Sequence, residues 1–317
     1  MFFAATAAAQ SLPTVSVHGH AIGNWCYQLQ GRSGAPLELD AIAASKYQLA
    51  VIDYSADGSS DGEFTAAQIA ALKNSAGGPK IVLAYMSIGE AENYRFYWNK
   101  AWTDSRGRPT AQAPAWLAVE NSDWSGNFKA RYWQPAWQAI IFGNDSAGAG
   151  KSYLDRIIDA GFDGVYLDII DAFEFFGPDG NNERPTAATD MAGFVEAIAN
   201  YARTTRGVSN FIVVPQNGSD LVRELDDTTL AGYFAAIDAI GAEDTFYYGN
   251  RANNNAWRPQ LWTIQNLDTF VANGKPVLAI DYVTGAKRVK RFDNACAQKG
   301  YLPYTAVRNL DRLTPLR

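Results

Sequence analysis

The sequence AGFDGVYLDIID, at residues 160–171, contains a helix end, a turn, an apolar strand and two acids in that order. Gly161 is typical of the residue that follows the last turn of a helix, and Gly164–Asp168 is an apolar run of strand length. In parallel α/β folds the carboxyl ends of the strands carry the active site, so Asp168 is a candidate catalytic residue. A lone Asp at this point more often caps the next helix, so the catalytic interpretation depends on the other acids.

The same alternation of short apolar runs and helical patterns continues along the chain, which is typical of βα units around a parallel sheet. We predict a (β/α)8 TIM barrel that forms a single domain over residues 13–317. The strands are expected at Trp25–Leu29, Leu49–Tyr54, Ile81–Met86, Gly164–Asp168, Phe211–Pro215, Ala236–Glu243, Val277–Asp281 and Leu302–Thr305. Helices are expected at Leu37–Ala44, Thr65–Asn74, Ser152–Ala160, Asp190–Thr205, Arg258–Ala272 and Ala286–Gln298.

Composition excludes several function classes. The chain has 317 residues, 47% of them hydrophobic, and a net charge of -6 without a basic stripe, so we expect no nucleic-acid partner. No apolar run is long enough to span a bilayer, so we expect no membrane partner. The two histidines, His18 and His20, precede every strong strand signal. A catalytic triad, a His-rich zinc site or a His base is therefore excluded, and carboxylates remain as the reactive groups.

A long aromatic-rich insertion follows the third predicted strand. It runs roughly over Asn93–Trp137, and loops of this length inside a domain are usually functional or disordered. We expect at least half of its tryptophans to form a satellite core and a few to face a cleft, where they could stack on sugar rings. The β-like run Phe128–Trp133 is assigned to this excursion and not to the barrel. The six tryptophans are Trp98, Trp102, Trp116, Trp124, Trp133 and Trp137.

The amino terminus and the two cysteines bear on localisation. Residues 1–12 resemble a leader remnant or a disordered end, with a small-residue cleavage pattern at Ala7–Ala9 but no basic region before it. We therefore expect a secreted or extracellular protein. We also expect the protein to be a monomer. Cys26 and Cys296 would be neighbours in a closed barrel, where they would form either one disulfide or two buried thiols.

Five segments together resemble the endo-α-1,4-polygalactosaminidases of glycoside hydrolase family 114, formerly labelled cysteinyl-tRNA synthetase-related. No nucleotide-binding signature supports that older label. The resemblance implies a (β/α)8 barrel that cleaves α-1,4-linked galactosamine polymers of the galactosaminogalactan type, without metal or organic cofactor. A cationic polysaccharide is then the expected partner. The segments are Trp25–Gly31, Leu49–Tyr54, Val82–Glu92, Arg131–Trp133 and Gly161–Asp171.

The resemblance also indicates the catalytic pair. It matches Asp168, after the fourth strand, and Glu243, after the sixth, and we predict Asp168 as nucleophile and Glu243 as acid/base. Asp171 competes with Asp168, although helix capping is its expected role. Two carboxyls with different environments are what glycoside hydrolysis needs.

The remaining candidates lie at or near strand ends and in the insertion. Asp53, Glu90 and Asp281 are expected either to receive substrate ammonium groups or to form salt bridges on the rim. Two other functions stay open: a hydrolase of another α-linked glycan, and a glycan-binding barrel without catalysis. The full set of predicted substrate-binding residues is Asp53, Tyr54, Tyr85, Glu90, Tyr132, Trp133, Asp171, Asn217, Tyr247 and Asp281.

Overall fold

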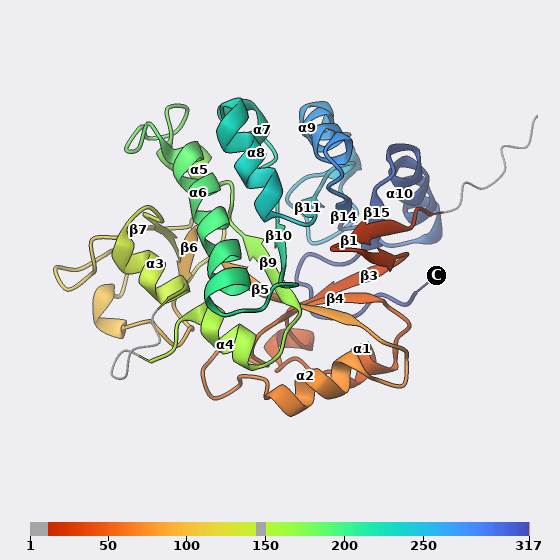
Figure 1. Ribbon diagram of the computed structural model, residues 1–317, viewed down its shortest axis with the longest axis horizontal. Helices are drawn as coiled ribbons and strands as arrows, with labels where there is room; N and C mark the ends of the chain where they lie inside the picture. The colour runs from red at the N-terminus through yellow and green to blue at the C-terminus, as the bar shows by residue number, and fades with distance from the viewer. Residues whose placement is uncertain (1–11, 144–149, 317) are drawn as a thin grey trace, which may run out of the picture.

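The computed structural model describes residues 12–143 and 150–316 (Figure 1). The expected leader at residues 1–12 lies outside the described residues, apart from Leu12. Within the described ranges, no helix has the length and hydropathy that a membrane span requires.

All eight predicted strands are present, and they form two parallel sheets with the orders β10-β9-β5-β4-β3 and β11-β14-β15. Seven of them begin and end within one residue of the prediction, whereas β11 begins at Ile240 and not at Ala236. Ala236 instead ends helix α8, whose start is capped by Asp226. The strands are β3 (Trp25–Gln28), β4 (Leu49–Asp53), β5 (Ile81–Ser87), β9 (Gly164–Asp168), β10 (Ile212–Pro215), β11 (Ile240–Glu243), β14 (Val277–Asp281) and β15 (Leu302–Thr305).

Two contacts link the sheets to each other. Gln216, just after β10, forms a parallel bridge with Gly241 of β11. On the other edge, the indole of Trp25 in β3 donates to the backbone oxygen of Leu302 in β15 at 3.0 Å. Every residue of β4, β5 and β14 is buried, which explains their continuous apolar sequences.

The helices cover these strands (Figure 1). Thr65 and Gln68 form a capping box at the start of α2, and Gly300, which has a φ of 72°, follows the last residue of α10. The helices are α1 (Asp40–Ala44), α2 (Ala66–Lys73), α3 (Pro135–Ile141), α4 (Tyr153–Asp159), α5 (Ala172–Phe176), α6 (Ala187–Asn200), α7 (Leu221–Glu224), α8 (Asp227–Ala236), α9 (Leu261–Ala272) and α10 (Ala286–Lys299). Shorter helical turns are Arg32–Gly34, Lys100–Trp102 and Tyr201–Thr205.

The insertion folds as a separate antiparallel sheet of order β6-β8-β7, and it forms one end of the molecule in Figure 1, beside α3. The β-like run of the insertion overlaps β8, which pairs only with β6 and β7 in the described chain. The small strands outside the two parallel sheets are β1 (Val15–Val17), β2 (His20–Ile22), β6 (Glu90–Glu92), β7 (Leu117–Glu120), β8 (Asn127–Ala130), β12 (Tyr247–Tyr248) and β13 (Ala256–Trp257).

Most tryptophans of the insertion pack into a core, as predicted, but only Trp124, and not a few of them, lines the cavity. Five of the six are buried or partly buried, and several rings contact one another, as in the pair Trp116–Trp137 with centroids 4.7 Å apart. Trp124 is the exception, with 52% of its surface exposed. A satellite core therefore accounts for most of these rings.

Cys26 and Cys296 are both buried, and no disulfide joins them. Burial raises the pKa of the Cys26 thiol, which makes its thiolate form unfavourable. Of the two sequence-based alternatives, the structure has the pair of thiols.

Candidate active site

A cavity of about 640 Å³ lies where the parallel strands end. It receives Asp53 from the end of β4, Tyr85 from β5, Asp168 from the end of β9 and Glu243 from the end of β11. Residues just beyond β10 and β14 complete this wall, namely Gln216, Asn217 and Tyr282. The predicted catalytic pair thus faces a single cavity.

Asp168 is held by one side chain and one backbone group. The hydroxyl of Tyr85 donates to its Oδ2 at 2.7 Å, and the backbone N–H of Ile169 donates to its Oδ1 at 2.8 Å. Ile169 has a φ of 60°, an unfavourable conformation for a β-branched residue. Strain of this kind concentrates at functional sites, and here it belongs to the residue whose N–H holds the carboxylate of Asp168.

Glu243 is held by three neutral donors. The side-chain amides of Gln216 and Asn217 donate to its Oε2 at 2.6 and 3.0 Å, and the hydroxyl of Tyr282 donates to its Oε1. Tyr27 in turn donates to Oε1 of Gln216 at 3.1 Å, which orients that amide. Both oxygens of Glu243 are therefore positioned by buried side chains.

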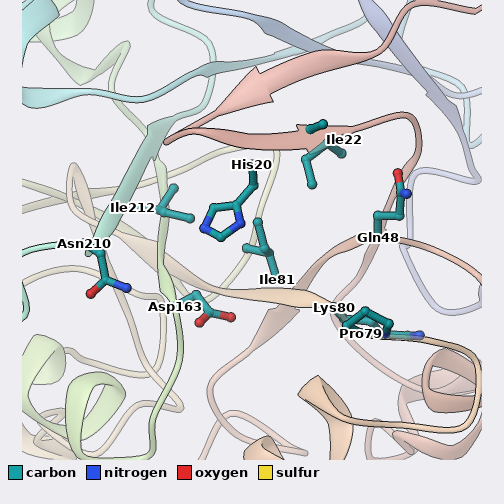
Figure 2. Close-up of a pocket in the computed structure, with 10 residues that line it drawn as sticks. His20, Ile22, Gln48, Pro79, Lys80, Ile81, Asp163, Asn210 and Ile212 are labelled. Atoms are coloured by element: carbon teal, nitrogen blue, oxygen red, sulfur yellow. The ribbon is translucent and has the colours of Figure 1, made fainter.

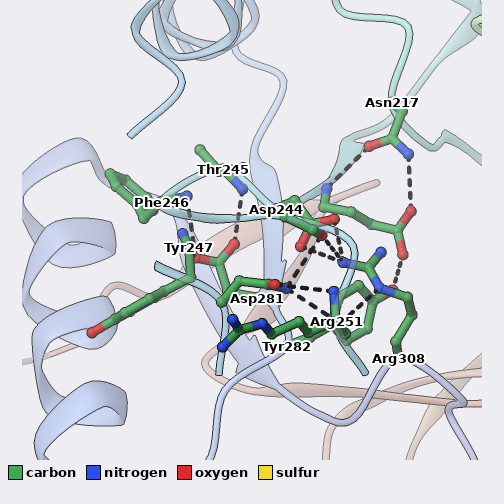
Figure 3. A network of polar contacts seen from close by, with 12 residues as sticks. Asn217, Asp244, Thr245, Phe246, Tyr247, Arg251, Asp281, Tyr282 and Arg308 are labelled. Carbon is green, nitrogen blue, oxygen red and sulfur yellow. Dashed lines mark hydrogen bonds and ion pairs between the residues drawn. The ribbon is translucent and has the colours of Figure 1, made fainter. Parts of the chain in front are cut away.

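Arg308 packs on the ring of Tyr282, whose hydroxyl donates to Glu243. The guanidinium carbon of Arg308 lies 4.3 Å from the centre of the Tyr282 ring, and its Nη2 binds both carboxylate oxygens of Asp244 at 2.9 and 2.7 Å (Figure 3). A cation over a phenol ring is attractive and fixes the position of that ring. Arg308 therefore holds Tyr282 where its hydroxyl reaches Glu243.

Glu243 influences the protonation of Asp168. Burial raises the pKa of Asp168 well above its ordinary value, and the negative charge of Glu243 raises it further. Two carboxylates that share a site retain one proton at a pH where an isolated carboxyl is ionised. The direction of the shift favours Asp168 as the residue that carries it. The roles predicted from sequence, with Glu243 as the acid, stay a prediction, and this direction favours the opposite assignment.

The raised pKa of Asp168 has a consequence for stability. The folded protein keeps a proton that the unfolded chain releases, so this group stabilises the fold fully below the unfolded pKa, and the contribution is lost as pH rises through the folded pKa. We expect Asp168→Asn to raise the Tm at pH 8 and to leave it nearly unchanged at pH 4. Thermal unfolding of both proteins at the two pH values tests this, and an equal Tm difference at both would contradict it.

Asp171 does not cap a helix with its side chain. It occupies the residue before α5, but its carboxylate accepts no capping hydrogen bond, and it lines the cavity instead. Burial raises its pKa, while Lys129 opposes that rise. The capping expectation for Asp171 is therefore wrong, because its carboxylate faces the cavity.

Asp53 and Glu90 are engaged in ion pairs. Both oxygens of Asp53 accept from Arg95, at 2.9 and 2.8 Å, and Arg95 also binds Glu92 at 2.7 Å. Glu90 is fully buried, pairs with Lys129 at 2.7 Å and accepts from Asn121 at 2.8 Å. Of the two sequence-based alternatives for these acids, the salt bridge is the one that the contacts favour.

Asp281 is engaged with the backbone. Its carboxylate accepts the N–H groups of Thr245, Phe246 and Tyr247, at 2.8, 3.1 and 2.7 Å, and so fixes the turn that follows Glu243 (Figure 3). It does not line the cavity, and neither does Tyr247, whose hydroxyl donates to the backbone oxygen of Arg288.

Three other predicted aromatics also lie away from the cavity. Tyr54 packs on Tyr153 with ring centroids 4.7 Å apart. Tyr132 is fully buried and donates to the backbone oxygen of Ala187, and Trp133 packs edge-on against Phe176 at 4.9 Å. The predicted site residues that do share the cavity are Asp168, Glu243, Asp53, Tyr85, Asp171 and Asn217.

Sequence reasoning missed several residues of the site. Gln216 stands directly after β10 and beside Asn217, so its strand-end position could have indicated it. Arg308 and Tyr94 lie in connections without such a signal.

A second cavity of about 350 Å³ lies at the opposite ends of the strands, beneath the β1–β2 hairpin (Figure 2). Its acid, Asp163, is already bound by Lys73 at 2.6 Å and by the backbone N–H of Val82 at 2.8 Å. The amino ends of parallel strands serve stability in such folds, so we place the chemistry in the larger cavity.

Two carboxylates in different surroundings, at the carboxyl ends of parallel strands in an α/β fold, are an arrangement that glycoside hydrolysis can use. The sequence model of glycoside-hydrolase family GH114 matches residues 4–314, and the chain belongs to this family. The resemblance found in the sequence is thereby confirmed.

Two relatives and one solved structure are similar to this chain. A protein of Methanocaldococcus jannaschii is 39% identical over 298 residues, which cover 91% of this chain and 77% of the relative. A protein of Deinococcus radiodurans is 36% identical over 295 residues, covering 92% and 83%. The glycoside hydrolase domain of PelA from Pseudomonas aeruginosa superposes with a TM-score of 0.58 at 18% identity, covering 92% of this chain and 97% of that domain. That likeness is one of fold.

Proposed function

We propose that this protein is an endo-acting glycoside hydrolase that cleaves α-1,4-linked galactosamine polymers of the galactosaminogalactan type. The observation that carries the proposal is the position of Asp168 and Glu243 on one cavity, each with its own hydrogen-bond donors. We also infer that the eight parallel strands close into a (β/α)8 barrel, with both acids on its carboxyl-terminal rim.

The chemistry follows from that pair. One carboxyl protonates the glycosidic oxygen as the bond breaks, and the other, ionised, attacks the anomeric carbon or activates a water. The proton on Asp168 provides the acid, since burial and the negative charge of Glu243 oppose its ionisation. The neutral donors around Glu243 stabilise its negative charge without cancelling it.

The charge of the cavity supports a cationic substrate. Its two basic side chains are neutralised by acids outside the lining, Lys129 by Glu90 and Arg308 by Asp244. Fixed negative charge in a cleft raises the local concentration of cations. Arg95 pairs with two of the acids that line the cavity, and Asp168 keeps a proton, so most of the fixed negative charge comes from the other four. The seven acids that line the cavity are Asp53, Asp57, Glu92, Asp123, Asp168, Asp171 and Glu243.

We expect the rate on a galactosamine polymer to fall as salt is raised from about 0.05 M to about 0.5 M, because screening weakens the attraction between exposed charges. The rate should fall again as the amines are N-acetylated. Initial rates on polymers of graded acetylation measure both effects. Equal rates on free and fully acetylated polymer would contradict the cationic substrate but not the catalytic pair.

The two alternatives predict different products. Digestion of partly deacetylated galactosaminogalactan should release oligosaccharides with galactosamine at the new reducing end, as read by mass spectrometry, and EDTA should not change the rate. Products from a neutral α-glycan alone would favour another glycan as substrate. Binding without products from either polymer would favour a glycan-binding protein.

The proposed substrate is an exopolysaccharide, so we propose that the protein acts outside the cell, as a monomer. Light scattering of the purified full chain checks the second point.

A further inference from the structure

Two exposed aromatic side chains stand on the wall of the catalytic cavity. Tyr94 is 46% exposed and Trp124 is 52% exposed, and both line the cavity together with Asp57 and Asp123. Exposed rings of this size leave apolar surface in water, which is unfavourable unless a ligand or partner covers it.

The turn that carries Trp124 is fixed by hydrogen bonds. Asn121, at its start, donates to the buried Glu90, and Glu120 accepts from Ser125 and from the backbone N–H of Gly126, at 3.1 and 2.8 Å. Among the described residues, no ring or cation stacks on Trp124 itself. Trp124 therefore lines the cavity with a ring that no other described ring or cation covers.

Tyr94 is held from behind. The guanidinium carbon of Arg95 lies 4.8 Å from the centre of the Tyr94 ring, and the Tyr94 hydroxyl donates to Glu92. A Cβ at Gly58 would come within 2.6 Å of the ring, so glycine with its φ of 82° allows the close approach. The ring is thus fixed without being buried.

Trp262 is a useful contrast, since it is the other strongly exposed tryptophan at 57%. Arg223 covers its ring at 3.7 Å and its indole N–H donates to Asp220. Trp262 does not line the cavity. Its exposure therefore has a local explanation that Trp124 lacks.

We propose that Trp124 and Tyr94 form a sugar-binding subsite beside the catalytic pair, which takes one protonated hexosamine unit of the polymer. The substrate class rests on the function proposed above. Aromatic faces attract ammonium groups as well as apolar sugar faces, and Asp57 and Asp123 supply negative charge beside them. Such a subsite gives affinity that increases when the bound chain is long enough to reach it.

The test measures binding separately from hydrolysis. In a Glu243→Gln background, α-1,4-galactosamine oligosaccharides of increasing length are titrated by calorimetry, which does not depend on the tryptophan that is replaced. Trp124→Ala should weaken binding of long oligosaccharides about tenfold, the size of a moderately desolvated cation–π contact, and hardly affect the shortest. Tyr94→Leu should have a smaller effect in the same direction. Trp262→Ala, the matched control, should change nothing.

Kinetics with active Glu243 give the second readout. Trp124→Ala should raise KM for the polymer and leave kcat nearly unchanged. The variant loses a contact to a sugar unit that lies away from the bond being cleaved. Unchanged affinity in Trp124→Ala, or an equal loss in Trp262→Ala, would overturn the subsite. If wild type binds through Trp124 but hydrolyses nothing, the subsite stands and the proposed enzymatic function fails. If the wild type hydrolyses the polymer and Trp124→Ala changes neither the affinity nor KM, only the subsite fails.

Discussion

Glu243→Gln and Asp168→Asn should each lower the rate of polymer hydrolysis by several orders of magnitude. Each removes one of the two groups that the reaction uses, and every 1.4 kcal/mol of lost transition-state stabilisation is about a factor of ten in rate. Initial rates of reducing-end release measure the loss, with circular dichroism to show that the fold is kept. Glu38→Gln, at an exposed acid away from the cavity, is the matched control and should retain full activity. More than a small residual activity in either variant would remove that residue from the catalytic pair.

Azide then assigns the two roles. If Asp168 is the acid/base of a retaining enzyme, as its raised pKa favours, azide should restore glycosyl transfer in an Asp168→Ala variant and give a product azide with retained configuration. If Glu243 has that role, the Glu243→Ala variant is the one that gives this product. An azide product of inverted configuration from either variant identifies the replaced residue as the nucleophile.

Arg95→Met should be the most destabilising single change at an ion pair described here. Arg95 is buried between Asp53 and Glu92, so its loss leaves two buried carboxylates without their cation. Removing one partner of a buried pair costs about 3 to 5 kcal/mol, which lowers the Tm of a chain of this size by roughly 10 °C. Thermal and urea unfolding measure both quantities.

Arg108→Met is the control for that experiment. Arg108 also pairs with an aspartate, Asp104, at 2.7 Å, but its side chain is 67% exposed, so we expect a loss of under about 1 kcal/mol. Adding Asp53→Asn to Arg95→Met should recover part of the stability, because it removes one stranded charge. Equal losses of stability in Arg95→Met and Arg108→Met would contradict the larger contribution that we assign to the buried ion pairs of Arg95.

The sequence alone predicted much of the fold. Apolar strand runs and their periodicity are local, so all eight parallel strands were located, and β4 and β14 read as continuous apolar segments because both of their faces are covered. Strand ends are local as well, which made Asp168 a candidate, whereas Glu243 was predicted from the family resemblance. Where a helix end and a strand start adjoin, as at Ala236, local pattern gave the wrong boundary.

Only the tertiary structure decided which acids remain available to a ligand. Asp53 is paired with Arg95, 42 residues away, and Arg308 is held by Asp244, 64 residues away, whereas Asp171 is left facing the cavity. It also decided that Trp124 is exposed while its neighbours in the insertion are packed. The physical reason is that charge neutralisation and ring burial depend on which residues the fold brings within a few ångströms, and the spacing of residues along the chain does not contain that information.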